Sequence, residues 1–358
     1  MTDSQQVVQQ NESGQKVFKP GALNLISDVP GVLVGNASDC AAETGVTVIR
    51  CEHAMTAAVD IRGGGPGTRE TALLSSENYV KQVNSLVFSG GSVFGLAAAD
   101  AVLTELSKQG VGLDITDNTR AIPIVPAAVL YDLHVDPNRH WSNASPYYDL
   151  GIAALLDATE QFSLGSVGAG TGAKAGLAKG GIGSTSIDLG EGIIVGALVA
   201  VNSVGSPLLP DGKSFYAWQY ELADEFGGCA PPTQKFELSD PFADGTRLSM
   251  DGRIKTGANT TLATIATTVD LSVSELKRVA MMAHDGMARA VRPIHTPFDG
   301  DIVFSLSNGQ VSAPKDDSIA RAMLVAQIGS AAADCLARAI ARGVYQARKA
   351  NQSAEANA

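Results

Sequence analysis

The chain has 358 residues, of which 45% are apolar, so it is long enough and apolar enough to bury a sizeable core. Lysine and arginine total 26 against 37 acidic residues, and the resulting formal charge of -11 repels phosphate backbones and anionic lipid. We therefore expect neither nucleic acid nor a membrane as a partner.

Targeting and metal-binding patterns are missing from the sequence. Residues 1–16 are polar and lack the basic start and apolar stretch of a signal peptide, and no later apolar run looks long and uninterrupted enough to cross a bilayer. We therefore expect a cytoplasmic protein. The histidines show no H-E-x-x-H spacing and the cysteines form no C-x-x-C pair, which predicts no metal site and buried free thiols. The cysteines are Cys40, Cys51, Cys229 and Cys335.

One continuous body lies between two polar ends. We expect residues 1–19 to form a disordered tail, residues 20–350 to form a single domain, and residues 351–358 to fray. Short apolar runs separated by glycine-rich turns have the length and composition of strands. These runs are Val46–Arg50, Thr56–Arg62 and Ser85–Phe88.

The middle of the chain changes character twice. The run that begins at Phe94 is typical of a buried helix ending at Gly110, and the run that begins at Gly192 is typical of a core strand. Residues 206–257 carry a proline pair, scattered aromatics and D-G turn signals. This composition predicts a long surface excursion before the chain returns to the core.

The last hundred or so residues alternate strand and helix signals. Small and β-branched residues predict a strand from Thr260 to Val269. Ser272 and Glu275 form a capping box ahead of a helix that Pro293 stops. A further strand is expected at residues 301–306 and an alanine-rich helix from about 318 to 350, which gives a mixed α/β protein.

Three glycine clusters resemble phosphate-binding loops without matching one. Val167–Gly183 contains a G-x-G-x-x-A string, but a weak strand precedes it and the later glycines oppose a following helix, so we interpret it as loop. It is either a structural crossover or a backbone nest for an anionic or polarised oxygen. The clusters Arg62–Glu70 and Ser89–Leu96 lack the phosphate-loop lysine, and Phe94 breaks the G-x-S-x-G elbow of many hydrolases.

The pair Asn259–Thr260 is the site that we single out. Asparagine before a threonine that opens a strand is a plausible strained junction, although two threonines at a strand start are also typical of plain β-propensity. The chemistry is coherent, since the Thr260 hydroxyl could attack the Asn259 carbonyl and water could then release a new amino terminus. A free α-amine has a pKa of about 7.7–8.0, so Thr260 would supply both nucleophile and general base.

Several long motifs in fixed order resemble the DmpA-type self-processing aminopeptidases, a family that includes the β-aminopeptidases and, more distantly, the nylon-oligomer hydrolase NylC. The resemblance runs from about Asp28 to Gly343 and implies cleavage between Asn259 and Thr260. The motifs are DVPGVLVGN (28–36), AAVDIRGGGPGTRET (57–71), FSGGSVFGL (88–96), VGAGTGAKAGLAKGGIG (167–183), VAVNSVGSP (199–207), GANTTLATIATT (257–268) and RPIHTPFDGD (292–301).

The resemblance implies roles for three residues near the reaction. Thr260 corresponds to the nucleophile, and Asn202 to the side-chain donor that stabilises the oxyanion, a donor whose loss typically costs about 2.7–4 kcal/mol. Lys179 resembles the family lysine near the nucleophile, whose charge would lower the pKa of the Thr260 amine.

Three further residues match positions that line the family's site. Tyr131 corresponds to a tyrosine of the site, and Asp299 and Asp301 fall where aminopeptidase members contact the substrate amine. The chain departs from many members in using threonine in place of serine and Asp-Gly-Asp in place of Ser-x-Glu. Both features resemble NylC, which leaves the substrate and the choice of terminal or internal cleavage open.

By resemblance, the fold is a four-layer α/β/β/α sandwich like that of N-terminal nucleophile hydrolases, cut into residues 1–259 and 260–358. The resemblance also implies a homo-oligomer, a tetramer of processed heterodimers, and no cofactor. The expected substrate is a small peptide or an amino-acid amide or ester. The alternatives are a nylon-type endohydrolase, acyl transfer like that of ornithine acetyltransferase, and an uncleaved small-molecule-binding protein.

Overall fold

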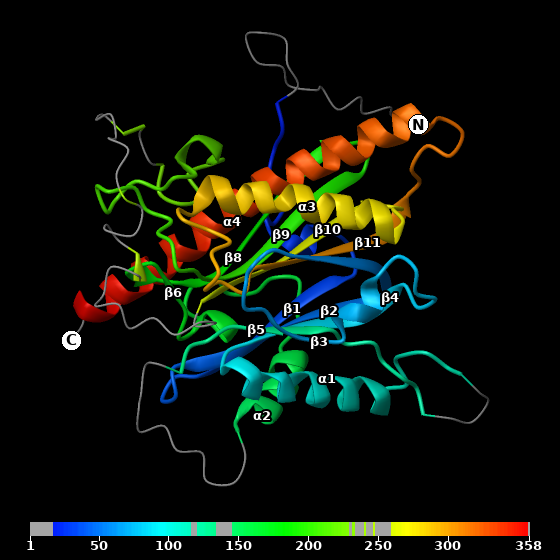
Figure 1. Ribbon diagram of the computed structural model, residues 1–358, viewed down its shortest axis with the longest axis horizontal. Helices are drawn as coiled ribbons and strands as arrows, with labels where there is room; N and C mark the ends of the chain where they lie inside the picture. Colours follow the sequence, from blue (N-terminus) through cyan, green and yellow to red (C-terminus); the bar gives the residue numbers. More distant parts are fainter. Residues whose placement is uncertain are drawn as a thin grey trace.

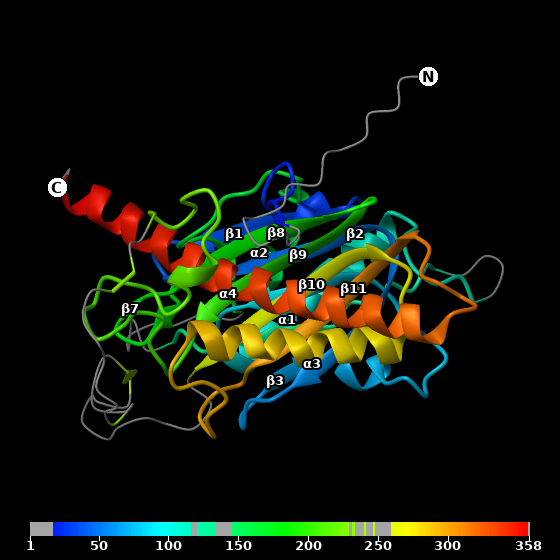
Figure 2. The same cartoon turned by 90° about the horizontal axis from the view of Figure 1, so that it is seen from above.

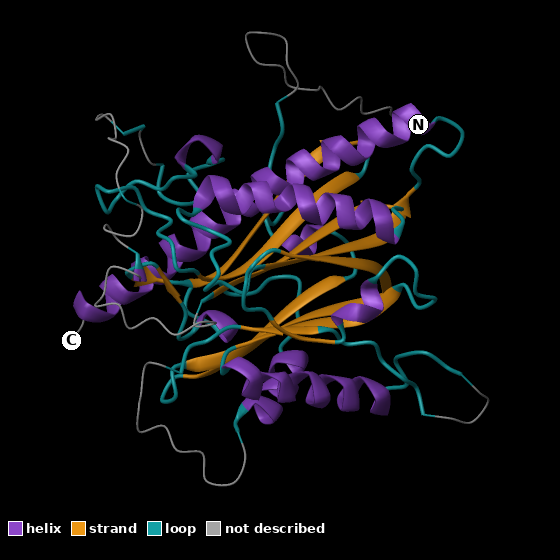
Figure 3. Ribbon diagram, in the orientation of Figure 1, coloured by secondary structure: helices purple, strands orange, loops and turns teal. Residues whose placement is uncertain are grey.

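A computed structural model describes residues 17–115, 120–133, 145–228, 231–232, 240, 246–247 and 259–356, with side chains up to residue 352. Two layers of strands lie face to face between two layers of helices (Figure 1 and Figure 3). Helices α3 (Val273–Ala290) and α4 (Ser318–Ala356) cover one outer face. Helices α1 (Ala97–Lys108) and α2 (Tyr147–Leu156) cover the other.

The strands form one continuous nine-stranded sheet that bends to give both layers. Its main path runs in the order β3-β5-β4-β2-β11-β10-β9-β8, and β1 pairs with β2. The bounds are β1 Val32–Asp39, β2 Thr44–Ile61, β3 Gly67–Arg69, β4 Gln82–Ser89, β5 Ala127–Val129, β8 Gly181–Gly190, β9 Ile193–Asn202, β10 Thr260–Val269 and β11 Ile302–Val311, and a separate hairpin joins β6 Lys174–Ala175 to β7 Ala178–Lys179.

Strand β2 connects the two layers because it is 18 residues long. Its first half, residues 44–51, pairs with β1, and its last residues, 56–61, pair antiparallel with β11. The sequence analysis predicted two short strands here, at 46–50 and 56–62. The residues between them continue the strand in extended conformation, and of these Glu52, His53 and Ala54 have exposed side chains.

Three hydrophobic cores separate the four layers. The first lies between the α3–α4 layer and strands β8–β11, the second between the two strand layers, and the third between the β1–β2–β4 face and α1–α2. Strand β10 contributes to two of them, since Ile265 faces the helices and Leu262 faces the other strand layer. Both faces of β10 are therefore covered, and all ten of its residues are buried, five of them threonines. The predicted mixed α/β sandwich is confirmed.

The predicted helix ends agree well with the structure. Helix α3 begins after the Ser272 cap, whose hydroxyl accepts the Glu275 amide while the Glu275 carboxylate accepts the Ser272 amide. It ends at Ala290, shortly before Pro293. Helix α4 begins at Ser318 as predicted but continues to Ala356, so the predicted helix end at about residue 350 is wrong.

Helix α4 is long and apolar enough to cross a membrane, contrary to the sequence expectation that no run is. In the fold it lies beside α3 over the sheet (Figure 2). Its apolar side chains, such as Leu336 and Ile340, are buried in the helix–sheet core. Arg338 on the same helix is buried against Glu225, with 2.6 Å between Nε and Oε1. These contacts are those of a core helix.

The glycine cluster Val167–Gly183 has a structural use. Its Gly168 and Ala169 amides donate to the hydroxyls of Ser38 and Thr47, so these two amides do not face an open anion site. Near its end, a Cβ on Gly183 would lie 1.9 Å from the Ala339 carbonyl of α4. The glycines therefore let β8 approach the helix backbone closely, which favours the structural reading over an anion nest. The last residues of the cluster belong to β8, and not to a loop.

Three other expectations need correction. The segment after residue 206 is not wholly superficial, because Phe215 and Phe226 are buried edge to face with 5.6 Å between ring centroids. Most of residues 229–258 lies outside the described part.

Cys51 and Cys335 are buried, which raises the pKa of both thiols to about 12, but Cys40 is exposed and Cys229 is not described. The tail prediction for 1–19 falls mainly on residues outside the description, yet the Lys19 carbonyl already accepts the Asp188 amide at 2.9 Å.

Candidate active site

Thr260 opens β10 and faces the carbonyl of the residue before it. The Thr260 hydroxyl donates to the Asn259 carbonyl oxygen at 2.5 Å, and the Gly300 amide donates to the same oxygen at 2.8 Å. Asn259 is fully buried and Thr260 is 2% exposed. The Asn259 carbonyl is thus polarised by two donors in a site closed to water.

Glycine is the only residue type that fits at position 300, beside this carbonyl. Asn259 forms a parallel bridge with Asp299, which brings the loop before β11 against the start of β10. A Cβ on Gly300 would lie 2.6 Å from the Thr260 Oγ1 atom and 2.8 Å from the Gly65 carbonyl oxygen. Both distances are shorter than ordinary contacts, so any side chain at position 300 must displace the hydroxyl or the backbone.

We expect Gly300→Ala to move the Thr260 hydroxyl and to suppress any reaction at the Asn259 carbonyl, with an overpacking cost of about 1–3 kcal/mol in the free energy of unfolding. Gly110→Ala is the control. Alanine there is strained by the backbone φ of +74°, but its added Cβ has nothing within 4 Å, so it tests destabilisation without a contact at the site. Denaturing electrophoresis measures chain cleavage and urea unfolding measures stability, so the two experiments separate loss of reaction from loss of folding free energy. Normal cleavage in Gly300→Ala would show that this contact does not matter.

Asn202 ends β9 directly opposite Thr260 in the antiparallel ladder and is fully buried. Its side-chain oxygen accepts the Lys174 amide at 3.0 Å and the Arg247 Nη2 group at 2.7 Å. Its side-chain nitrogen donates to the Tyr131 carbonyl at 3.1 Å. The bonds to the oxygen orient the amide so that its NH₂ group faces the Tyr131 side.

Lys179 lies on the hairpin that flanks Asn202. It pairs across the hairpin with Lys174, whose backbone contacts Asn202. Burial lowers the pKa of the Lys174 ammonium, and the charges of Arg247 and Lys179 lower it further. This end of the sheet therefore carries a concentration of positive charge next to Asn202.

The two carboxylates of the Asp-Gly-Asp motif are fully buried and hold backbone around Thr260. Asp299 accepts the Val204 amide at 3.2 Å and both the amide and hydroxyl of Thr296, at 2.9 and 2.7 Å. Asp301 accepts the Thr261 amide at 2.8 Å. In the uncut chain both carboxylates thus bind the protein itself, and contact with a substrate amine stays a prediction.

Two histidines extend the site behind Asp301. The Asp301 carboxylate accepts the His295 amide at 3.0 Å and lies 2.8 Å from His295 Nδ1. The His295 ring meets His284 edge to face with 4.8 Å between centroids, and His284 Nε2 lies 3.2 Å from the Asp60 carbonyl oxygen. His284 is buried on α3.

Two buried groups of the site shift the pH dependence of stability in opposite directions. Burial, followed by the nearby Asp301 charge, raises the pKa of Asp299 to about 6, so its protonated form favours the fold and stability falls as pH rises from about 4 to 6. Burial, followed by the nearby His295 charge, lowers the pKa of His284 to about 4, so stability rises with pH from about 4 to 6.5. Each effect is on the order of 3 kcal/mol and the two largely cancel.

Replacing either Asp299 or His284 should reveal the pH dependence of stability that the other residue causes. In a Thr260→Ala background, expected to keep the chain in one piece, Asp299→Asn should lose stability as pH falls from about 6.5 to 4, and His284→Asn should lose it as pH rises from about 4 to 6. Urea unfolding at several pH values measures both slopes. Parallel slopes in the two variants would contradict this assignment.

Comparisons with known proteins identify the family. The model of Peptidase family S58 matches residues 24–357. The chain belongs to peptidase family S58. It is 40% identical over 345 residues to a Mycobacterium tuberculosis protein named as an uncharacterized aminopeptidase, covering 91% of this chain and 95% of that one. It is 29% identical over 315 residues to the 6-aminohexanoate-oligomer endohydrolase of a Kocuria species, covering 86% and 81%.

Solved structures agree on the fold. The L-aminopeptidase D-Ala-esterase/amidase of Ochrobactrum anthropi, described as a variant of the Ntn hydrolase fold, superimposes with a TM-score of 0.66 at 20% identity, covering 93% of this chain and 89% of that one. A Burkholderia β-aminopeptidase gives 0.61 at 20% identity, covering 97% of each. The protein is thus an S58 enzyme that hydrolyses peptide bonds, and the expected family resemblance is confirmed.

Most of the predicted S58 site residues converge in the structure. Asn259, Thr260, Asp299 and Asp301 lie within one bonded cluster, and Asn202 joins it across the β9–β10 ladder. Tyr131 contributes through its carbonyl, and Lys179 is linked through Lys174. The described interactions are those of the uncut chain. Among the described residues, no group of three or more histidine, cysteine or acidic side chains is arranged to hold a metal ion.

The sequence reasoning missed three residues of this S58 site. Gly300 and His295 fall inside the motif RPIHTPFDGD, so the motif itself could have drawn attention to them. Arg247 had no such signal, because it lies in the turn-rich segment that was interpreted as a surface excursion. The residue is in fact half-buried, and its guanidinium lies against Asn202 and Asn259.

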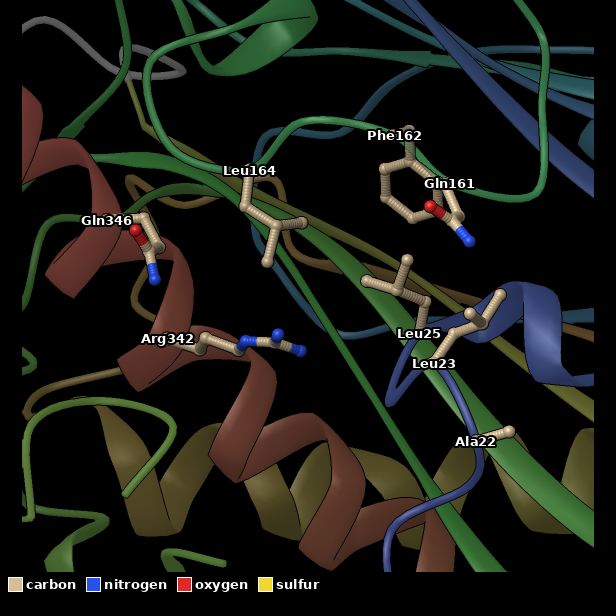
Figure 4. A pocket seen from close by; sticks show the side chains of 8 residues that line it. All are labelled: Ala22, Leu23, Leu25, Gln161, Phe162, Leu164, Arg342 and Gln346. Carbon is tan, nitrogen blue, oxygen red and sulfur yellow. The ribbon is translucent and has the colours of Figure 1, made fainter. Parts of the chain in front are cut away.

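A hollow elsewhere on the S58 domain is separate from this cluster. It lies between the N-terminal segment, the loop before η4 (Gly168–Gly170) and helix α4, as Figure 4 shows. None of the predicted site residues lines it. Its lining residues are Ala22, Leu23, Leu25, Gln161, Phe162, Leu164, Arg342 and Gln346.

Proposed function

We propose that the chain cuts itself between Asn259 and Thr260 and that the freed Thr260 is the N-terminal nucleophile of an aminopeptidase. The observation that carries this proposal is the Asn259 carbonyl oxygen, which accepts both the Thr260 hydroxyl at 2.5 Å and the Gly300 amide at 2.8 Å. A hydroxyl and a second donor at one buried peptide carbonyl are the two parts that an acyl shift needs.

In the first stage, the Thr260 Oγ atom attacks the Asn259 carbonyl carbon through a five-membered ring. Negative charge develops on the carbonyl oxygen, where the Gly300 amide already donates and needs little reorganisation. The C–N bond then breaks, the Thr260 nitrogen takes a proton, and an ester links Asn259 to the threonine oxygen. Water hydrolyses this ester, which leaves a carboxylate on Asn259 and a free amine on Thr260.

In the second stage, the free amine is the general base for its own hydroxyl. An α-amine titrates at about 7.7–8.0, close to neutral pH, and positive charge nearby lowers its pKa and keeps more of it in the basic form. Lys179 supplies such a charge on the hairpin beside Asn202. Asn202 is a candidate oxyanion donor for the substrate carbonyl, because it lies opposite Thr260 and its amide is already oriented. Acyl transfer to Thr260 and hydrolysis of the acyl-enzyme complete the cycle.

For the substrate, we propose short peptides or amino-acid amides with a free amino terminus. The name of the M. tuberculosis relative supports this class at 40% identity over nearly the whole chain. The Kocuria relative is the observation that favours a second candidate, internal cleavage of ω-amino-acid oligomers, at 29% identity. A cytoplasmic location and a tetramer of processed heterodimers complete the proposal as expectations from the sequence.

Product analysis separates these functions. The purified enzyme is incubated with alanine tripeptide and 6-aminohexanoate oligomers, each with a free and with an acetylated amino terminus, and with or without an added amine acceptor. Release of the first residue from free-amine substrates alone supports the aminopeptidase. Internal cleavage of acetylated oligomers, or transfer to the acceptor in excess of hydrolysis, would replace it with the endohydrolase or the acyltransferase. Thr260→Ala, purified in parallel, controls for contaminating peptidases.

A further inference from the structure

Arg247 connects three parts of the site. Its Nη1 group donates to the side-chain oxygen of Asn259, the residue on the acyl side of the proposed cut. Its Nη2 group donates to Asn202 Oδ1 at 2.7 Å and to the Lys174 carbonyl at 3.0 Å. One planar guanidinium thus fixes the side chain of Asn259 relative to the end of β9 and the β6–β7 hairpin.

Arg247 is half-buried as a residue, but its guanidinium lies against Asn202 and Asn259 and its Nε atom is shielded from solvent. Burial lowers the pKa of Arg247 to about 10, and the Asp299 charge acts in the opposite direction, so the group stays protonated at neutral pH. A buried charge is costly unless hydrogen bonds compensate it, and here the compensating acceptors are Asn259, Asn202 and a backbone carbonyl. The charged group is therefore held in place by these three acceptors and in turn fixes their positions.

Asn259 has a competing reaction that makes its side-chain position important. Its own Nδ2 atom can attack its backbone carbonyl carbon, form a new C–N bond in a five-membered imide ring, and expel the Thr260 nitrogen as an amine. This route breaks the same peptide bond but uses no water, so the large fragment ends in a succinimide one water lighter than a carboxylate. The Nδ2 atom is buried with no partner among the described residues, whereas Oδ1 is held by Arg247.

We propose that Arg247 is a positioning residue for self-cleavage, because it holds Asn259 by its side-chain oxygen and thereby presents the Asn259 carbonyl to the Thr260 hydroxyl and not to the asparagine's own amide. The inference rests on the proposed function, since it concerns the same cut. Arg247 touches Asn259 through the side chain only and takes no part in bond breaking.

The test follows cleavage of newly made full-length chain in cell-free synthesis, by denaturing intact mass over time. Wild type, Arg247→Met, Arg247→Lys and Arg342→Met are compared, each after confirming a native-like thermal melt. Arg342 is the control because it also bonds backbone carbonyls, those of Asn24 and Ser184, but at the hollow away from the site. We expect Arg247→Met to slow cleavage about 100-fold, Arg247→Lys to recover part of the rate, and Arg342→Met to cleave normally.

Two readouts separate positioning from general destabilisation. Arg247→Met should yield some large fragment one water lighter, and in an Asn259→Ala background the same substitution should slow cleavage far less, because the shared contact is already lost. Cleavage of Arg247→Met at the wild-type rate, or an equal loss in both backgrounds, would overturn the inference. Absence of cleavage in wild type, or its persistence in Thr260→Ala, would instead overturn the proposed function.

Discussion

Replacing Thr260 by alanine is expected to abolish both chain cleavage and amide hydrolysis, with a loss of about 10⁴-fold or more in kcat/KM. The variant loses the only hydroxyl that contacts the Asn259 carbonyl among the described residues. Thr260→Ser keeps that hydroxyl and should cleave and hydrolyse at a reduced rate, because serine lacks the methyl group that fills the buried start of β10. Hydrolysis of an amino-acid amide, measured beside electrophoresis, gives both effects.

The neighbouring Thr261 supplies a matched control. Its hydroxyl is buried with no partner among the described residues, and only its backbone amide bonds the site. Thr261→Val preserves shape and removes an unpaired polar group, so cleavage should proceed normally and stability should be equal or higher. If Thr261→Val lost as much cleavage as Thr260→Ala, cleavage would depend on the packing at the start of β10 and not on the Thr260 hydroxyl.

Asp301→Ala is expected to be the most destabilising single change at the site, at about 3–5 kcal/mol in the free energy of unfolding. The substitution leaves the amides of the fully buried Thr261 and the half-buried His295 without their acceptor. Because Asp301 anchors the residue after Thr260, the same variant should also fail to cleave. Asp301→Asn keeps one acceptor oxygen and should lose less stability.

Urea unfolding in a Thr260→Ala background measures this cost on an uncut chain. Asp334→Asn is the comparison, because Asp334 pairs with Arg289 at 2.7 Å but both side chains are about one-third exposed. Such a pair contributes only about 0–1 kcal/mol. A similar small loss for Asp301→Ala would show that its buried hydrogen bonds do not anchor β10.

The fold was largely predictable where local patterns are strong. The capping box at Ser272, the strand of small and β-branched residues from Thr260 and the start of α4 each follow from neighbouring residues, and the structure agrees with all three. The joining of two short runs into one long β2 was not predictable, because it depends on the long-range pairing of residues 44–51 with β1 and of residues 56–61 with β11, on either side of an exposed middle. The layer order followed from the family resemblance and not from periodicity.

The site was predictable only in part. Its named residues came from motifs in the sequence, but their bonds came from long-range topology. Asp299 reaches Val204 across 95 positions, and Asn202 reaches Tyr131 across 71. Composition did not distinguish Arg247 from any other arginine in a turn-rich segment, since only the folded chain shows that its guanidinium bonds the side chain of Asn259. The local sequence of Asp299 and Asp301 is that of two solvated carboxylates in a turn. In the structure both are buried and accept hydrogen bonds from the backbone around Thr260.

The most direct test of the central claim is the intact mass of freshly purified wild type under denaturing conditions, with the amino-terminal residue of each fragment determined. Self-cleavage predicts two fragments, residues 1–259 and residues 260–358, whose masses sum to the full chain plus one water, and a new amino terminus that begins with Thr260. A single uncut chain that nevertheless hydrolyses amino-acid amides, or a cut at any other bond, would contradict it.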